Sequence, residues 1–531
     1  MEDYPPEVRS APLLLCGLVG ATQIHGQLTK VLHESAMKEW GNTRVKYLSF
    51  SYDMRIPPCK RGGKDAPGYR IGGILKRRWL EKVCNLVPAV LVVCFDWTED
   101  LQPSPPEEAQ AVTQLQHAQR QARDRELRIL VLVIVHANAA EPEAMCSSLR
   151  QQLEGTTGTL VVVKGMHDLA ARAQKVERSV YTSAMGFYAE EEKRHRKVWN
   201  PRPANVPQWA LTAMQVRVLV KIGFLSEFRK DTRGALNSYT KAYDQLRTCT
   251  DIADVVERMA LCNLISYRMY QRYFTSHDVA TAVFHCRVHT QTLRGCSDDD
   301  GALAWRKWRW LSANHQLFGE MLENTAQAMP VLMNEVHPSE TPNQADMWQF
   351  PGFHFKLAAT YARRLKQWAR EVAGGRLPPA ALAGGELVPA VFLGQSEWLE
   401  RPEECSDDPS VEVALRNAHS QAAEVVCSQQ CLQLLTRAQA CYKERDYTAG
   451  ALACSALIAE EYLEVGNMFA ATKLYERLRR SRAEDESGQQ GRWPEWVGLR
   501  CFALERAILC GCRVLGLESL PSICTRHLAA P

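Results

Sequence analysis

The first 200 residues alternate apolar runs of strand length with segments of helix length. Two runs, AVLVVCF at 89–95 and ILVLVIV at 129–135, are almost continuous aliphatic residues. Strands that are covered on both faces have this pattern, and it is typical of parallel sheets. The expected strands are 13–19, 44–51, 89–97, 129–136 and 159–164, and the expected helices are 23–40, 73–86, 107–125 and 141–152. The alternation predicts a doubly wound, mostly parallel α/β domain over 1–200, and five strands suit the flavodoxin-like order 2-1-3-4-5.

The strand signal ends at Pro207. From Trp209 onward, apolar residues recur every three or four positions, and glycine, alanine and tyrosine mix in the segments that open near Asp446 and Gly466. Small residues let paired helices approach, and aromatic rings fill the space between pairs. We therefore predict an irregular, tetratricopeptide-like α-solenoid over 201–531, with loops near 338–351, 374–409 and 484–491. The helix stop Asn200-Pro201 marks the boundary between the two domains.

Composition excludes several classes of protein. The net charge is +4 over 531 residues, whereas a nucleic-acid-binding domain is clearly basic. Trp305, Trp308 and Trp310 alternate with basic residues, but their helical spacing favours core packing over stacking on nucleobases. Apolar stretches of about ten residues are too short to span a bilayer, and the N-terminus lacks a signal peptide. We expect a soluble, cytoplasmic chain with no nucleic-acid partner.

The 18 cysteines do not form a recognisable metal or redox motif. Most of them lie in apolar patterns, and no C-x-x-C pair occurs. Cys427 and Cys431 could share a helix face. In a chain without an export signal, such residues are typical reduced core thiols. We predict no metal site.

Doubly wound folds often bind nucleotides at the first strand-to-helix turn, where a phosphate loop would lie. Gly17 and Gly20 are three residues apart, and neither a Gly-Lys-Ser/Thr sequence nor a G-x-G-x-x-G fingerprint is present. Asp96 and His136 end strands, where turn or capping roles are the simplest interpretation. No nucleophile–base set is evident, so we predict neither catalysis nor a cofactor. A nucleotide-binding enzyme or sensor built on the α/β domain stays as the alternative.

A basic stretch lies between the second and third expected strands. Its members are Lys60, Arg61, Lys64, Arg70, Lys76, Arg77 and Arg78. A glycine-bearing basic loop that leads into a helix could contact anionic lipid or an acidic protein partner. The other interpretation is a solvated loop and helix face.

Several stretches resemble proteins of the foie gras family. They are Gly73 to Lys76 with Trp79 and Asn85 to Ala89; Phe224 to Phe228 with Asp231, Thr232, Ala235, Leu236, Tyr239, Ala242 and Tyr243; Pro351 to Phe355 with Ala358, Ala359, Tyr361 and Ala362; and Gly394 to Ser396. They follow the family's order over about 330 residues. The resemblance implies an α/β domain followed by an α-solenoid.

The resemblance also implies a function. Foie gras proteins are scaffold subunits of the TRAPP membrane-tethering complex, which activates Rab-family GTPases in ER-to-Golgi transport and autophagy. Other TRAPP subunits would be the partners, and the location would be cytoplasmic and peripheral on Golgi and ER–Golgi intermediate membranes. Family members usually continue into C-terminal β-sandwich domains, which we expect to be absent here because no run of short strands follows the last helices.

Overall fold

The computed structural model of the chain describes residues 6–51, 56–57, 73–76, 78–99, 104–139, 141, 143–154, 158–198, 208–248, 255–296, 304–328, 347–373, 409–480 and 502–510. They fall into two compact units: the first ends at Met269 and the second begins at Tyr270. The predicted boundary near residue 200 stays a prediction. The expected loops at 374–408 and 484–491, and residues 338–346 of the first expected loop, lie outside the described residues.

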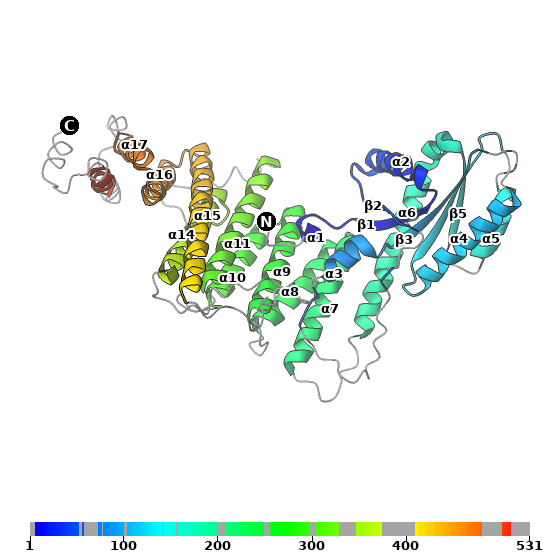
Figure 1. The fold of residues 1–531 in the computed structure, drawn as a ribbon, viewed down its shortest axis with the longest axis horizontal. Coiled ribbons are helices and arrows are strands. Elements are labelled where there is room, and N and C mark those ends of the chain that lie inside the picture. The colour runs from blue at the N-terminus through cyan, green and yellow to red at the C-terminus, as the bar shows by residue number, and fades with distance from the viewer. Residues whose placement is uncertain are drawn as a thin grey trace. The chain divides into compact units, whose positions relative to one another are not determined.

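The first unit is built around a parallel sheet of five strands in the order β2-β1-β3-β4-β5. The strands are β1 Leu14–Gly20, β2 Val45–Ser49, β3 Val90–Trp97, β4 Arg128–Val135 and β5 Thr159–Lys164. On one face lie α2 (Thr22–Trp40) and α6 (Gly165–Val198), and on the other lie α4 (Pro105–Arg123) and α5 (Ser147–Leu153) (Figure 1). The predicted doubly wound fold is confirmed, and the strands follow the flavodoxin-like order 2-1-3-4-5.

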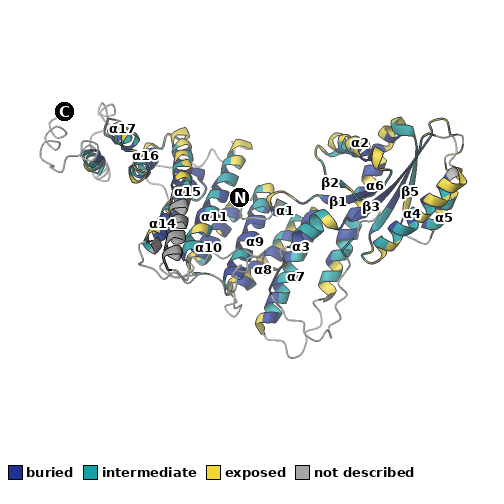
Figure 2. Cartoon of the chain, in the orientation of Figure 1, coloured by how far each residue is buried: buried dark blue, intermediate teal, exposed yellow. Residues whose placement is uncertain are grey.

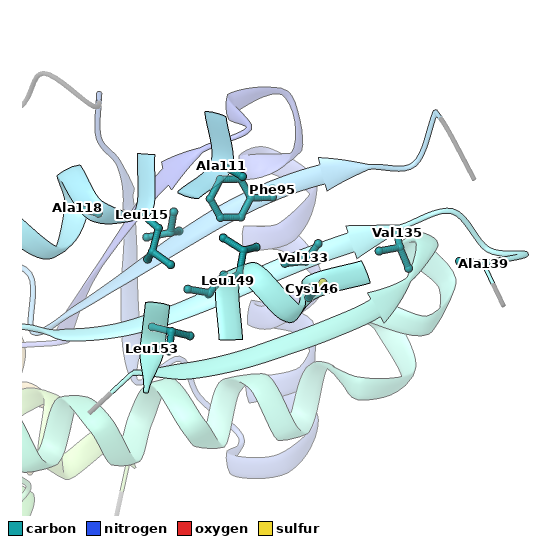
Figure 3. Close-up of a cluster of buried hydrophobic side chains, with 12 residues drawn as sticks. Phe95, Ala111, Leu115, Ala118, Val133, Val135, Ala139, Cys146, Leu149 and Leu153 are labelled. Carbon is teal, nitrogen blue, oxygen red and sulfur yellow. The ribbon is translucent and has the colours of Figure 1, made fainter. Parts of the chain in front are cut away.

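The continuous aliphatic runs are explained by burial on both faces of the sheet. Val131, Val133 and Val135 of β4 pack with Phe95 of β3 against Leu115 of α4 and neighbouring side chains of α5 (Figure 3). The alternate residues of β4, Leu130, Leu132 and Ile134, are also buried. Figure 2 shows that β3 and β4 are mostly buried, whereas the outer faces of α4 and α5 carry exposed residues.

Two predicted helix starts were wrong. The expected helix 73–86 begins only at Arg78: α3 (Arg78–Glu81) leads directly into a π-helical turn, η1 (Lys82–Leu86), whereas residues 73–76 are not helical. The reason is tertiary, since side chains of later helices take up the peptide groups of Gly73 and Ile74, as described below. The expected helix 141–152 begins with a 3-10 turn, η2 (Ala144–Cys146), and becomes α5 at Ser147.

All regular secondary structure described from residue 208 onward is helical, which confirms the predicted α-solenoid. The first unit continues with α7 (Gln208–Phe228), α8 (Thr232–Thr248) and the start of α9 (Val255–Thr275). The second unit holds the end of α9 and a series of further helices, in which α11, α14, α15, α16 and α17 each pack on the next. Their bounds are α10 Val279–Arg294, α11 Ala304–Ala328, α14 Pro351–Ala373, α15 Pro409–Glu444, α16 Thr448–Glu464 and α17 Met468–Arg480, with helical residues also at 502–510.

The same turn chemistry joins several consecutive helices. Lys230, His277 and Asp446 have φ between 53° and 60°, and Gly466 has φ 84°. A residue in this left-handed region ends a helix, and an Asp or Asn side chain then caps the next one. Asp231, Asp278 and Asn467 accept hydrogen bonds from backbone amides three residues on, at 2.8, 3.1 and 3.1 Å. The repeat-like appearance of the sequence thus comes from a recurring turn with irregular spacing.

Glycines let aromatic rings sit between paired helices, as the sequence predicted. A Cβ atom on Gly223 of α7 would lie 2.5 Å from the ring of Tyr239 on α8, and one on Gly450 of α16 would lie 2.7 Å from Tyr442 on α15. Trp308 stacks on Tyr361 with ring centroids 6.0 Å apart and packs in a small cluster with Trp368, which agrees with a packing role.

Among the described helices, α7 is long and apolar enough to cross a membrane by length and composition, with half of its most apolar window buried in the fold. It packs against α6 and α8. A core helix of a solenoid gives the same signal, because it is apolar on more than one side.

The carboxyl group of Glu177 on α6 is fully buried beneath β1 and β2. Tyr47 donates its hydroxyl to Glu177 Oε2, whereas Oε1 has no hydrogen-bond partner within the described part of the chain. Burial raises the pKa of Glu177 to about 7. The carboxyl group is therefore protonated in the folded chain at pH values where it is already ionised in the unfolded chain.

A pKa that is higher in the folded state makes the free energy of unfolding fall as pH rises from about 4.5 to about 7. We predict that Glu177→Gln raises the free energy of unfolding by about 2–3 kcal/mol at pH 8 and changes it little at pH 5. Chemical denaturation at both pH values measures this difference. Glu34→Gln, at an exposed position of α2, is the matched control; an equal effect of Glu177→Gln at both pH values would contradict the assignment.

Candidate functional site

The carboxyl edge of the sheet is where a doubly wound fold binds ligands, at the point between β1 and β3 where strand order reverses. Here the turn after β1 is closed by the protein itself. Gly20 has φ 105°, and the amide of Ala21 donates to the Cys94 carbonyl of β3 at 3.0 Å. Gln23 Nε2 lies 3.4 Å from Asp96 Oδ2. A carboxylate in this position would repel a phosphate that binds without a cation.

The two strand-end residues singled out from the sequence occupy turns. Asp96 Oδ1 accepts the hydroxyl of Thr98 at 2.8 Å and its amide at 3.3 Å. His136 Nδ1 accepts the amide of Asn138 at 3.1 Å. Gly17 lies within β1, where a Cβ atom would be 2.6 Å from the ring of Phe50. Each residue is accounted for by local packing or capping.

The best-defined polar site in the first unit is a docked segment, residues 73–76, between β2 and β3. Gly73, Ile74 and Leu75 are buried. Arg217 of α7 donates from Nη2 to the Gly73 carbonyl and from Nε to the Ile74 carbonyl, both at 2.6 Å. The Ile74 amide donates to the buried carboxylate of Glu257 on α9. Two helices that follow more than 100 residues later thus hold the peptide groups of this segment.

Trp79 of α3 extends the docking contact. Its ring meets Phe224 of α7 edge-on at 5.7 Å between centroids, and the ammonium of Lys221 lies 5.4 Å from its ring centre. Burial, followed by the positive charges of Arg217 and Lys82, lowers the pKa of Lys221 to about 8. Basic side chains of the docked segment, η1 and α7 therefore converge here.

Only part of the predicted basic stretch falls within the described residues. Lys76 is exposed, and the side chain of Arg78 is 93% exposed, with Glu81 4.0 Å away. Lys60, Arg61, Lys64, Arg70 and Arg77 lie outside the described residues. Arg217 and Lys221 were not predicted from the sequence as part of the basic stretch, because they lie far along the chain on α7. They are four residues apart within an apolar stretch, so they share one face of the helix, and this spacing was the signal that could have identified them.

The two helices that hold the docked segment, α7 and α9, also share a buried ion pair. Arg268 of α9 donates from Nε to Glu227 Oε1 of α7 at 3.0 Å and from Nη2 to Oε2, and both side chains are buried. Tyr239 of α8 donates to Glu227 Oε1 at 2.6 Å. Arg268 Nη1 donates to the carbonyls of Val8 and Ser10, at 2.8 and 3.0 Å. The pair therefore holds the segment that leads into β1.

The second unit contains one group of side chains, within the described residues, that could hold a metal ion. One ligand atom from each of Cys286, His315 and His354 lies within 4.8 Å of the others, and all three residues are buried. They come from α10, α11 and α14. The sequence prediction of no metal site did not consider them, because their separations of 29 and 39 residues match no short motif.

We predict that Arg268→Met lowers the free energy of unfolding of the first unit by about 3–5 kcal/mol, because it leaves the Glu227 carboxylate buried without its partner. Thermal or urea unfolding measures this loss. Arg247→Met on the exposed side of α8 removes an equal charge and is expected to change stability by less than about 0.5 kcal/mol. Equal effects of the two substitutions would show that the ion pair does not hold this unit together.

The geometry defines a class of protein: an α/β domain joined to an α-solenoid, in which buried charged groups tie distant segments together. The family model described as Foie gras liver health family 1 matches residues 255–494. Trafficking protein particle complex subunit 11 from Bos taurus and from Homo sapiens are each 22% identical over 465 residues, and the Gallus gallus protein is 22% identical over 469 residues. Each alignment covers 83% of this chain and 39% of the relative.

Residues 255–494 therefore match the foie gras family model, and most of the chain is similar to the subunit 11 proteins of the trafficking protein particle complex. The resemblance stated from the sequence is confirmed. The chain spans about two fifths of the length of these relatives.

Proposed function

We propose that the chain is a non-catalytic scaffold subunit of a trafficking protein particle (TRAPP) complex that tethers membranes and activates Rab-family GTPases. In this proposal it acts in ER-to-Golgi transport and autophagy, and its direct partners are other subunits of the complex. Contact with the GTPase is indirect. The chain is cytoplasmic and binds peripherally to Golgi and ER–Golgi intermediate membranes.

The observation that carries the proposal is similarity over 83% of the chain to proteins named as subunit 11 of that complex. The scaffold role is supported by the partners of the buried polar side chains. In the first unit, Arg217, Glu257, Arg268 and Glu227 all bind other parts of the same chain. The alternative, a nucleotide-binding enzyme or sensor, gains no support from the carboxyl edge, where the Asp96 carboxylate accepts a hydrogen bond from Gln23 in the turn after β1.

Affinity purification tests the scaffold proposal directly. We expect the tagged chain, expressed in its own cells, to co-purify with other subunits of the complex in fixed ratios measured by quantitative mass spectrometry. A tag-only purification is the control. A folded chain that recovers none of these subunits, from a lysate in which the complex is intact, would refute the proposal.

We further propose that the basic stretch around the docked segment contacts an anionic membrane surface. Lys76 and Arg78 are exposed at the end of a segment that Arg217 and Glu257 hold in place. An anchored basic segment loses less conformational entropy on binding than a free one. Each basic residue near an anionic surface contributes about 1 kcal/mol at moderate salt.

Vesicle flotation measures this contact. We predict that Lys76→Glu, Arg77→Glu and Arg78→Glu together reduce binding to vesicles with about 30% phosphatidylserine by tenfold or more, at low salt, because the three charges change sign. The control of equal charge is Arg120→Glu, Arg123→Glu and Lys175→Glu on exposed positions of α4 and α6. Wild-type binding that is insensitive to salt, or an equal loss in the control, would contradict a membrane role. Co-purification with the other subunits should stay unchanged in the first variant.

A further inference from the structure

Four buried histidines and a buried cysteine gather in the second unit, on α10, α11 and α14. They are His285, Cys286 and His289 of α10, His315 of α11 and His354 of α14. His315 and His354 have no exposed surface. Burying imidazole and thiol groups in a core costs free energy unless their polar atoms have hydrogen-bond or metal partners. The arrangement of these partners indicates what the cluster can bind.

The orientation of His354 follows from its outer contact. Its Nε2 lies 2.9 Å from the carbonyl oxygen of Trp348, which can only accept a hydrogen bond. Nε2 therefore carries the hydrogen, and Nδ1 presents a lone pair to the interior. That Nδ1 lies 2.9 Å from Nδ1 of His315. A histidine whose outer nitrogen donates to a backbone carbonyl has the second-shell arrangement typical of metal ligands.

Thr290 and His354 contact the two ring nitrogens of His315. Its Nε2 lies 3.4 Å from the hydroxyl oxygen of Thr290, a contact at the long end of hydrogen bonding. Its Nδ1 faces His354. In the metal-free chain a proton shared by the two Nδ1 atoms joins the rings, and a cation between these atoms would replace that proton.

The sulfur of Cys286 supplies a third donor with an oriented neighbour. Tyr270 donates its hydroxyl to Asn314 Oδ1 at 3.1 Å, which turns the amide nitrogen toward sulfur. Asn314 Nδ2 lies 3.9 Å from Cys286 Sγ. An N–H group directed at sulfur stabilises a thiolate, the form that binds metal.

His289 follows Cys286 by three residues on α10 and is fully buried. Cys286 and His289 thus form a C-x-x-H pair on one face of a helix. About one helical turn separates the two side chains, so His289 is the candidate for a fourth ligand on this face of α10.

We propose that Cys286, His315 and His354, with His289 as the fourth ligand, form a buried zinc site that ties α10, α11 and α14 together. One sulfur and three imidazole nitrogens are a donor set that suits tetrahedral Zn²⁺. Bond lengths of about 2.3 Å to sulfur and 2.0–2.1 Å to nitrogen place ligand atoms roughly 3.3–3.6 Å apart. Donor atoms already within 4.8 Å reach this spacing through side-chain rotation and small helix shifts.

Zinc binding displaces the thiol proton, which passes to solvent, and Cys286 binds as the thiolate. The hydrogen on His315 Nδ1 moves to Nε2, where the Thr290 hydroxyl oxygen can accept it, so both rings bind as neutral imidazoles. Affinity must therefore rise with pH.

The test uses the full chain with a tag that does not bind metal. Elemental analysis after zinc loading and gel filtration is expected to give one tightly held Zn²⁺ per chain, with a lower dissociation constant at pH 8 than at pH 6.5. Cys286→Ser and His315→Gln are expected to lose this zinc. Cys454→Ser, which alters another fully buried thiol in the same unit, should keep it. Asn314→Leu should weaken binding by about tenfold to hundredfold.

Cobalt binding can be measured on the wild-type chain, so this test does not require that the variants fold. Wild-type chain loaded with Co²⁺ should show thiolate-to-cobalt charge transfer and the visible bands of a tetrahedral site. Zinc in hundredfold excess over its dissociation constant should raise the melting temperature by about 5–10 °C. Wild-type chain that retains no stoichiometric metal, a spectrum without thiolate ligation, or equal zinc in Cys286→Ser would overturn the proposal and leave a hydrogen-bonded histidine pair.

Discussion

The buried pair of Glu227 and Arg268 is the interaction on which the first unit depends. Each charge would be strongly unfavourable in this interior without the other, so α7 and α9 must stay in the register that joins them. Arg268 has donors left after it binds Glu227, and the carbonyls of Val8 and Ser10 accept them. The segment before β1 is thereby fixed on the helices, and β1 begins four residues after Ser10.

A second attachment reaches the neighbouring strand. Arg217 and Glu257 bind the peptide groups of residues 73–76, and the chain then passes through α3 and η1 into β3. β1 and β3 are adjacent in the sheet. Each of these two strands is preceded in the chain by a segment that α7 and α9 hold. Two of the stretches that carry the family resemblance take part in these contacts: Gly73 and Ile74 supply the peptide groups, and Glu227 binds Arg268.

The sequence predicted those parts of the fold in which local pattern and tertiary environment agree. The aliphatic runs at 89–97 and 129–136 became β3 and β4 because both faces of the sheet are covered, and α8 follows its apolar stripe from Thr232. Residues 73–76 were expected to be helical, because nothing nearby shows that Arg217 and Glu257 will bind their peptide groups. Long-range hydrogen bonds of this kind override local propensity.

The candidate sites were predictable to different degrees. The basic stretch was visible as a run of lysine and arginine, whereas its neighbours Arg217 and Lys221 were hidden on a helix that reads as apolar. The cluster of Cys286, His315 and His354 is assembled from three helices, so no spacing rule finds it. Its local trace was the C-x-x-H pair of Cys286 and His289, which becomes informative only when α11 and α14 bring two further imidazoles beside it.

Through the Glu227–Arg268 pair and the docked segment, sheet and helices of the first unit are expected to form one cooperative structure. Native-state hydrogen exchange of the full chain, followed by mass spectrometry at increasing sub-denaturing urea, measures this cooperativity. We expect amides of β1, β3, α7 and the first half of α9 to share one opening free energy and one dependence on urea. A sheet whose amides open with a different free energy from those of α7 and α9 would contradict it.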